Sequence, residues 1–146
     1  MKYATVRHVG IVVNNLDRNK DFWINTMGFE LCIEAIEQSP FIDELIAVSN
    51  PGLTTVKLTD PNGFIIELLK FENYETEVCW SGDLKRTGLT HIALTVNNLF
   101  DLVESLKIQN YLLLSEIKIS PNKNVHVVFV EGPEGIMLEL VQEIKS

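Results

Sequence analysis

The sequence predicts an α+β fold in which two β-α-β-β-β repeats form an incomplete barrel. First, the stretch HVGIVVNNL at residues 8–16 recurs as HIALTVNNL at residues 91–99. Second, DPNGFIIELL at residues 60–69 recurs as GPEGIMLELV at residues 132–141. Third, 146 residues are enough for one domain with its own core, or for two half-size units that share a core, and a hydrophobic fraction of 46% is typical of a globular protein. Similar stretches at both ends of each half indicate that one supersecondary unit is repeated.

The first repeat covers about residues 5–72. Its predicted elements are a strand at 5–13, a helix at 16–27 and strands at 29–37, 53–59 and 64–72. The first strand is predicted because its residues are apolar and β-branched, and Asn14-Asn15 supplies a helix cap. The helix is amphipathic and ends at Gly28. Pro61 and Gly63 favour a turn at 60–63, because they suit turn positions with fixed or positive φ.

The second repeat covers about residues 88–143 and follows the same plan. Its predicted elements are a strand at 90–96, a helix at 99–109 and strands at 111–119, 124–131 and 136–143, with a turn at 132–135. The two repeats make one domain over residues 1–146, joined by a linker at about 73–88, part of which is expected to pack through Trp80.

Residues 39–50 have no counterpart in the second repeat. We expect this insertion to form a short surface helix that caps the core. The alternative is a lid over an apolar pocket, formed by the apolar residues of the same segment.

Composition excludes several classes of protein. The formal net charge of −8, with only three arginines, disfavours binding to nucleic acid. No apolar run is long enough to cross a bilayer, and the N-terminus shows no secretion signal, so we expect a cytoplasmic protein without membrane contact. Cys32 and Cys79 are too few for a disulfide framework and are expected to be reduced thiols, one in the core and one in a loop.

Two glutamates raise a problem of burial. Glu67 and Glu139 each lie between apolar residues in a strand that is expected to be covered on both faces. A carboxylate buried there without partners is strongly unfavourable or retains its proton. Because side chains alternate along a strand, His8 and His91 are expected to face the inside of the barrel. Two imidazoles and two carboxylates at matching ends of the repeats predict a metal site.

Each of these residues taken singly has a structural alternative. A lone strand histidine is more often a surface or hydrogen-bonded residue than a ligand, and a lone glutamate can pair with an arginine. Recurrence of all four in register favours metal ligation. His126 has no counterpart in the first repeat and is predicted to be a surface-facing strand residue.

Several motifs together resemble a known family. They are the HVGIVV and HIALTV strands, the helix ending in FWINTMGFE, and the D-P-x-G-x-x-x-E-L pattern at residues 60–68. With the β-α-β-β-β repeat, they resemble the vicinal oxygen chelate superfamily (glyoxalase, bleomycin resistance and dioxygenase proteins), and glyoxalase I in particular. The resemblance covers essentially the whole chain and implies the incomplete barrel of that fold.

The resemblance implies a metal-dependent lyase or isomerase of the glyoxalase I type. One divalent metal ion (Ni, Zn, Co, Mn or Fe) would be held by His8, Glu67, His91 and Glu139, since two nitrogen and two oxygen ligands suit all of these ions. The reaction would transfer a proton next to a carbonyl through a metal-bound enediolate. Glu67 and Glu139 are the catalytic candidates, with Glu139 preferred as the base. The substrate would be a small molecule. Proteins similar to glyoxalase I often form homodimers, and the sequence leaves open whether this chain does.

Other chemistries on this scaffold stay open. A methylmalonyl-CoA epimerase-like enzyme would use the same proton transfer, whereas an iron-dependent ring-cleaving dioxygenase needs only two histidines and one glutamate. A metal-free small-molecule binding protein needs no ligands at all. The residues that bind substrate are not predicted. Only Arg7 and Arg86 stand where they could meet the carboxylates of glutathione, so its use also stays open.

Overall fold

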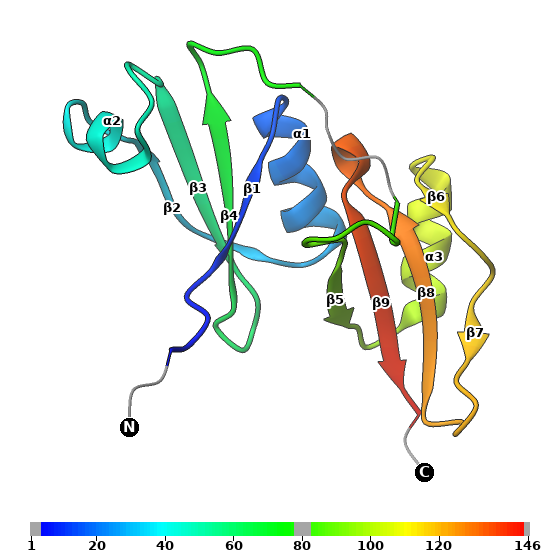
Figure 1. The fold of residues 1–146 in the computed structure, drawn as a ribbon. Helices are drawn as coiled ribbons and strands as arrows, with labels where there is room; N and C mark the ends of the chain where they lie inside the picture. The colour runs from blue at the N-terminus through cyan, green and yellow to red at the C-terminus, as the bar shows by residue number, and fades with distance from the viewer. Residues whose placement is uncertain (1–3, 78–82, 145–146) are drawn as a thin grey trace. The chain divides into compact units, whose positions relative to one another are not determined.

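The structure is a computed structural model that describes residues 4–77 and 83–144. The chain divides into two compact units, Met1–Glu77 and Val78–Ser146, each built from one β-sheet with helices (Figure 1). This confirms the predicted α+β fold class, and neither sheet closes into a barrel. Cys79 and Trp80, on which two expectations rested, lie outside the described residues.

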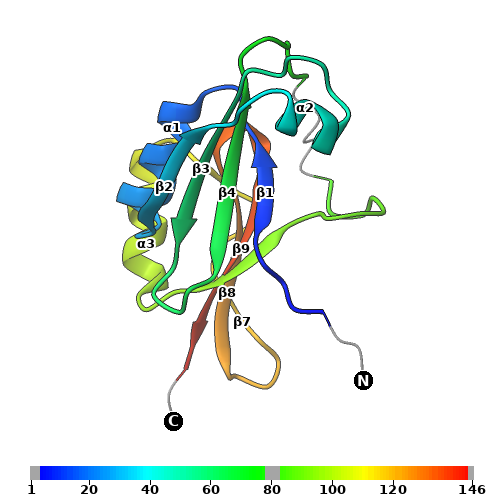
Figure 2. The same cartoon turned by 90° about the vertical axis from the view of Figure 1, so that its left-hand side faces the viewer.

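The first unit has a four-stranded sheet in the order β1-β4-β3-β2. Its elements are β1 (Val9–Val12), α1 (Leu16–Asp21), the π-helix η1 (Phe22–Thr26), β2 (Glu30–Ile36), α2 (Phe41–Ile46), β3 (Leu53–Thr59) and β4 (Ile65–Phe71). Strand β1 runs parallel to β4, and the other neighbours are antiparallel. The helices α1 and α2 lie on opposite sides of this sheet, as Figures 1 and 2 both show.

The core of the first unit lies between the sheet and α1. Alternation along β4 turns Ile66 and Leu68 to this side, where both are fully buried. Phe22 and Trp23, at the start of η1, are also fully buried, and their rings meet edge to face. The helix predicted for residues 16–27 is α-helical only as far as Asp21 and continues as a π-helix at Phe22–Thr26.

The predicted turn joins β3 to β4. The Asp60 carboxylate accepts hydrogen bonds from the backbone N–H groups of Asn62 and Phe64, both at 2.8 Å. Gly63 takes a positive φ of 86°, which a side chain would make unfavourable. The hairpin therefore pairs outward from Thr59 and Ile65, which places Lys57 directly opposite Glu67.

The insertion forms the short helix α2, as predicted. Ile42 is buried, whereas Phe41 is largely exposed. The carboxylate of Asp43 accepts hydrogen bonds from the Ser39 hydroxyl and from the backbone N–H of Asn50, and these bonds lower the pKa of Asp43 below its ordinary value. This one side chain therefore ties both ends of the α2 segment together.

The second unit repeats the arrangement with the strand order β5-β9-β8-β6, and β7 also pairs with β8. Its elements are β5 (Ile92–Thr95), α3 (Leu99–Ile108), β6 (Leu112–Leu113), β7 (Lys118–Ile119), β8 (Val125–Glu131), the 3-10 helix η2 (Pro133–Gly135) and β9 (Met137–Glu143). The side chain of Asn98 caps α3 as that of Asn15 caps α1. Apolar residues of α3, including Leu99, Val103 and Leu106, are buried in the core of this unit.

Three expectations need correction. The strand predicted for residues 111–119 is two short strands, β6 and β7, because the chain between them leaves its pairing with β8. Cys32 is a free thiol as expected, but it is exposed on the edge strand β2. His126 is not surface-facing but half-buried: its Nδ1 is buried without a hydrogen-bond partner, and its ring packs against Phe100 with centroids 5.3 Å apart.

No helix in residues 4–77 and 83–144 is both long and apolar enough to span a membrane.

Candidate metal centre

The first predicted ligand pair meets where β1 begins. Strand β1 pairs with β4 so that Gly10 lies beside Glu67, and His8 comes immediately before the strand, two residues earlier on the same face. The His8 imidazole Nε2 lies 2.7 Å from Oε2 of Glu67. The sequence prediction that His8 and Glu67 share one face of the first sheet is therefore correct, although His8 lies just outside the strand.

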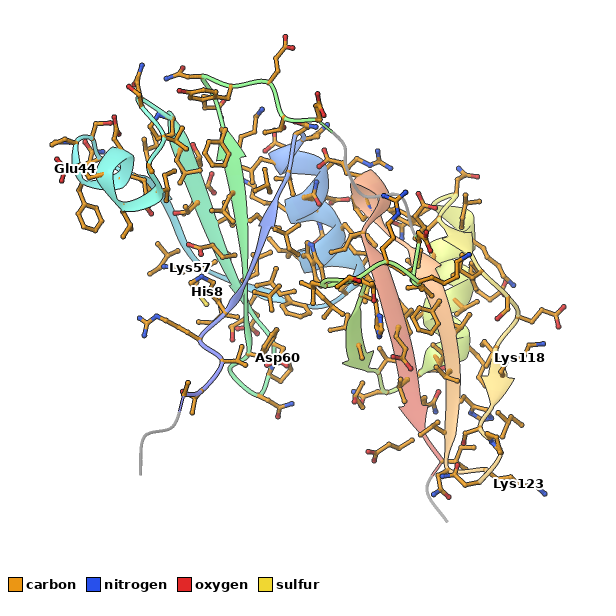
Figure 3. All side chains as sticks on the ribbon, viewed as in Figure 1. His8, Glu44, Lys57, Asp60, Lys118 and Lys123 are labelled. Atoms are coloured by element: carbon orange, nitrogen blue, oxygen red, sulfur yellow. The ribbon has the colours of Figure 1, made fainter. Side chains whose placement is uncertain are left out.

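Glu67 has a second partner that the sequence analysis did not identify. The Lys57 ammonium, on the next strand β3, lies 3.7 Å from Oε1 of Glu67. Figure 3 shows His8 and Lys57 on the side of the sheet away from α1. One carboxylate oxygen thus faces an imidazole, and the other faces an ammonium group.

The environment of Glu67 fits the burial that the sequence predicted. Its side chain is 11% exposed, whereas those of His8 and Lys57 are 32% and 35% exposed. A carboxylate with so little access to water needs nearby donors or cations. His8 and Lys57 provide them, and both remain accessible to a ligand.

The second pair repeats the geometry with a looser contact. Ala93 of β5 lies beside Glu139 of β9, and His91 immediately precedes β5. The His91 Nε2 lies 3.3 Å from Oε2 of Glu139. The Thr90 hydroxyl lies 2.9 Å from the other imidazole nitrogen, Nδ1, which fixes the ring so that Nε2 faces the carboxylate.

Glu139 differs from Glu67 in two respects. Its side chain is 28% exposed, so the second carboxylate is less buried than the sequence predicted. The residue opposite it on β8 is Phe129, where the first unit has Lys57. The Phe129 ring packs edge to face on the His91 imidazole, with centroids 5.2 Å apart. We call the His8–Glu67 pair the first half-site and the His91–Glu139 pair the second half-site. The first half-site has an ammonium group opposite its carboxylate, whereas the second has an aromatic ring there.

In the structure, the four predicted ligands lie in two pairs, one in each unit. Each unit brings one imidazole and one carboxylate together, which are donor types that first-row divalent ions accept. Among the residues that the structure describes, no group of three or more His, Cys, Asp or Glu side chains gathers as a metal site. The donor chemistry of each pair fits half of a four-ligand centre.

The sequence analysis did not identify Lys57 and Phe129 as neighbours of the glutamates. Two strands joined by a turn pair outward residue by residue, so the length of the loop decides which residue faces each glutamate. Counting outward from the predicted turns at 60–63 and 132–135 would place Val56 opposite Glu67 and Val128 opposite Glu139. In the structure each loop is one residue longer, because pairing begins at Thr59–Ile65 and at Glu131–Met137, and this register places Lys57 and Phe129 opposite the glutamates.

A surface hollow in the first unit lies apart from this chemistry. Its lining includes Asn14 and Asp17 near the start of α1, and Lys70 on β4. Lys70 is three residues from Glu67 along β4 and faces the opposite side of the sheet. This hollow is therefore separate from the candidate metal centre.

Comparisons with known proteins agree with this architecture. The family model described as the Glyoxalase/Bleomycin resistance protein/Dioxygenase superfamily matches residues 7–129. The Bacillus subtilis protein YwkD is 21% identical over 143 residues, which cover 98% of this chain and 100% of that protein.

Solved structures share the fold. A glyoxalase family protein from Bacillus cereus superposes with a TM-score of 0.90 at 21% identity, covering 99% of this chain and 97% of the other. The trypanothione-dependent glyoxalase I of Leishmania major gives a TM-score of 0.65 at 20% identity, covering 97% of this chain and 88% of that one. With the family match over most of its length, the chain belongs to the glyoxalase/bleomycin resistance protein/dioxygenase superfamily.

Proposed function

We propose that this protein is a metal-dependent lyase or isomerase of the glyoxalase I type, which transfers a proton between neighbouring carbons next to a carbonyl. The observation that carries the proposal is the repeated pair: at the same place in each unit, an imidazole nitrogen lies within about hydrogen-bonding distance of a carboxylate oxygen, at 2.7 Å and 3.3 Å. Many members of the superfamily are enzymes, and small-molecule substrates are typical of it.

In this proposal, His8, Glu67, His91 and Glu139 together hold one divalent ion, Ni, Zn, Co, Mn or Fe. When bound, the ion supplies Lewis-acid stabilisation of the negative charge that develops on a substrate oxygen. The cytoplasmic location stays a prediction from the sequence, and a homodimer stays open. The single domain made of two repeats is likewise a prediction from the sequence.

The two glutamates are given different roles because their surroundings differ. Glu67 is nearly buried and lies between His8 and Lys57, so it is suited to remain a fixed ligand. Glu139 is more exposed and has the longer contact to His91, so its carboxylate has more freedom to move. We assign Glu139 as the base: its carboxylate accepts the proton from one carbon and returns it to the neighbouring carbon.

Exchange of the substrate C–H proton with solvent deuterium tests this proposal. Protein reconstituted with Ni²⁺ or Co²⁺ is incubated in D₂O with hemithioacetals or with acyl-CoA epimers, and deuterium incorporation is followed by NMR. We expect incorporation by the wild-type protein and a loss of at least about 100-fold for Glu139→Gln. A hemithioacetal substrate supports the lyase, whereas exchange of the acyl-CoA alone supports the epimerase. Oxygen consumption with catechols would instead support a dioxygenase.

One observation favours a second candidate, a metal-free small-molecule binding protein. Lys57 and His8 already compensate the charge of Glu67 without a metal ion. Metal analysis of the purified and reconstituted protein separates the two candidates. About one equivalent per chain supports the enzyme, and a chain that retains no ion after reconstitution supports the binding protein.

A further inference from the structure

Thr90 immediately precedes His91 and contacts the ring nitrogen that is not beside Glu139. The Thr90 hydroxyl lies 2.9 Å from Nδ1 of His91, which is a hydrogen-bonding distance. In residues 4–77 and 83–144, this imidazole nitrogen is the only hydrogen-bond partner of that hydroxyl. The O–H group is therefore free to turn, and it serves His91 alone.

The carboxylate of Glu139 determines which nitrogen of the neutral His91 ring carries the proton. Nε2 of His91 lies 3.3 Å from Oε2 of Glu139. An ionised carboxylate offers only acceptors, and a neutral imidazole has one N–H group and one lone pair. The contact is attractive when the N–H group is on Nε2, which leaves the lone pair on Nδ1. The hydroxyl of Thr90 then donates its hydrogen to Nδ1.

Metal ligation through Nε2 would reverse this arrangement. A histidine binds a metal ion through the lone pair of one ring nitrogen, so ligation by Nε2 leaves the proton of the neutral ring on Nδ1. The Nδ1–H group then needs an acceptor. The Thr90 hydroxyl provides one after rotation of its O–H group, because it carries two lone pairs as well as a hydrogen.

The first repeat lacks this arrangement. The residue before His8 is Arg7, which is exposed and has only donors in its side chain. In the part of the chain that the structure describes, the His8 imidazole has the carboxylate of Glu67 as its only polar partner, at 2.7 Å. The position of that ring depends on its carboxylate, whereas the second imidazole is held from its other side.

We propose that Thr90 is a positioning residue that sets the tautomer of His91. Its hydroxyl donates to Nδ1 while Nε2 faces Glu139, and it accepts from Nδ1–H when Nε2 binds a metal ion. The second part rests on the proposed function, because it takes His91 as a metal ligand. Since Thr90 holds the ring, Glu139 is not needed for that task, which fits the assignment of Glu139 as the base.

NMR of the ring nitrogens tests the first part in the metal-free protein, at a pH at which the His91 ring is neutral. Long-range proton–nitrogen spectra report the ratio of the two tautomers, and His91→Gln identifies the signals of this ring. We expect the Nε2–H form in the wild-type protein, and a fall of about fivefold in its ratio to the Nδ1–H form in Thr90→Val, which removes the hydroxyl and keeps the shape of the side chain. Thr90→Ser keeps the hydroxyl and should retain the wild-type ratio. An unchanged ratio in Thr90→Val, or an equal fall in Thr90→Ser, overturns the inference.

Isothermal titration with Co²⁺ tests the second part. We expect Thr90→Val to weaken Co²⁺ binding by about tenfold or more, as is typical for loss of a group that supports a ligand, and Thr90→Ser to stay within about twofold of the wild-type affinity. The control is Thr95→Val, at an exposed residue of β5 whose hydroxyl makes no hydrogen bond within the described ranges. It should change neither the tautomer ratio nor the affinity, and thermal melts establish that all variants are folded.

The two measurements separate this inference from the proposed function. If the wild-type protein binds no Co²⁺, the proposed function and the second part fail together, whereas the tautomer ratio still decides whether Thr90 sets the ring of His91. If the wild-type protein binds Co²⁺ and Thr90→Val binds it equally well, the proposed function stands and the second part is overturned.

Discussion

Replacing Glu67 by glutamine separates its proposed role as a metal ligand from its role in stability. The substitution keeps the shape of the side chain and removes its charge. The amide can still accept a hydrogen bond from His8, whose Nε2 lies 2.7 Å from the present carboxylate. The ion pair with Lys57 at 3.7 Å is lost.

The expected change in stability is small. At an effective dielectric constant of about 20, two charges about 4 Å apart attract by about 4 kcal/mol before solvent screening. Lys57 is 35% exposed, and such pairs contribute only about 0–1 kcal/mol once screening is included. Glutamine also avoids the cost of burying a charge, which opposes this loss. We therefore expect the free energy of unfolding of the metal-free protein to change by less than about 1 kcal/mol.

The expected change in metal affinity is large. Loss of a group that merely supports a ligand typically weakens metal binding by about 10–100-fold. Loss of a ligand itself should cost at least about 100-fold, which corresponds to about 2.8 kcal/mol. Isothermal titration with Co²⁺ measures this affinity, and urea denaturation of the metal-free protein measures stability.

Glu34→Gln is the matched control, because Glu34 is an exposed carboxylate in an ion pair with Lys20 at 3.1 Å. It should change neither quantity by more than experimental error. The reasoning is refuted if Glu67→Gln binds Co²⁺ as tightly as the wild-type protein. A loss of about 3 kcal/mol or more in stability with unchanged metal affinity would identify Glu67 as a structural residue.

Three further predictions concern the scaffold. Trp23→Ala should lower the free energy of unfolding by about 3–5 kcal/mol in urea denaturation, because the Trp23 ring is fully buried. The control Phe41→Ala, at a residue that is 65% exposed, should lower it by less than about 0.5 kcal/mol, and similar losses for the two variants would contradict the packing described. Asn98→Ala should cost about 1 kcal/mol in the same assay through loss of the cap of α3, and an unchanged stability would remove that role. The pKa of Asp43, measured by NMR titration, should lie below its ordinary value because the Ser39 hydroxyl donates to the carboxylate, and Ser39→Ala should raise it. Because folding lowers this pKa, the contribution of Asp43 to stability is present above its unfolded pKa and is lost as the pH falls through the folded pKa; an ordinary pKa in the wild-type protein would contradict the assignment.

Local features were the most predictable from sequence. The turn at 60–63 follows from chain chemistry alone, since Asp60 accepts backbone hydrogen bonds and Gly63 adopts a positive φ. The caps Asn15 and Asn98 likewise act on their own helices. These features depend on residues a few positions apart, so the sequence shows them directly.

Features that depend on distant packing were predicted less well. Residues 111–119 read as one apolar strand, yet only the ends of this segment pair with β8 as β6 and β7. The π-helix at Phe22–Thr26, where two adjacent aromatic residues are fully buried, was not predicted from the sequence. His126 was expected to face solvent, but Phe100, far away in the sequence, packs against it.

The sequence by itself determined the duplicated β-α-β-β-β plan, the α+β fold class and the place of His8, Glu67, His91 and Glu139 within it, because repeat spacing and strand alternation are local properties. The tertiary structure alone decided that the two half-sites differ: pairing across the hairpins puts Lys57 against Glu67 and Phe129 against Glu139. The physical reason is that the burial and charge of a side chain depend on its neighbours in adjacent strands, which no single strand contains.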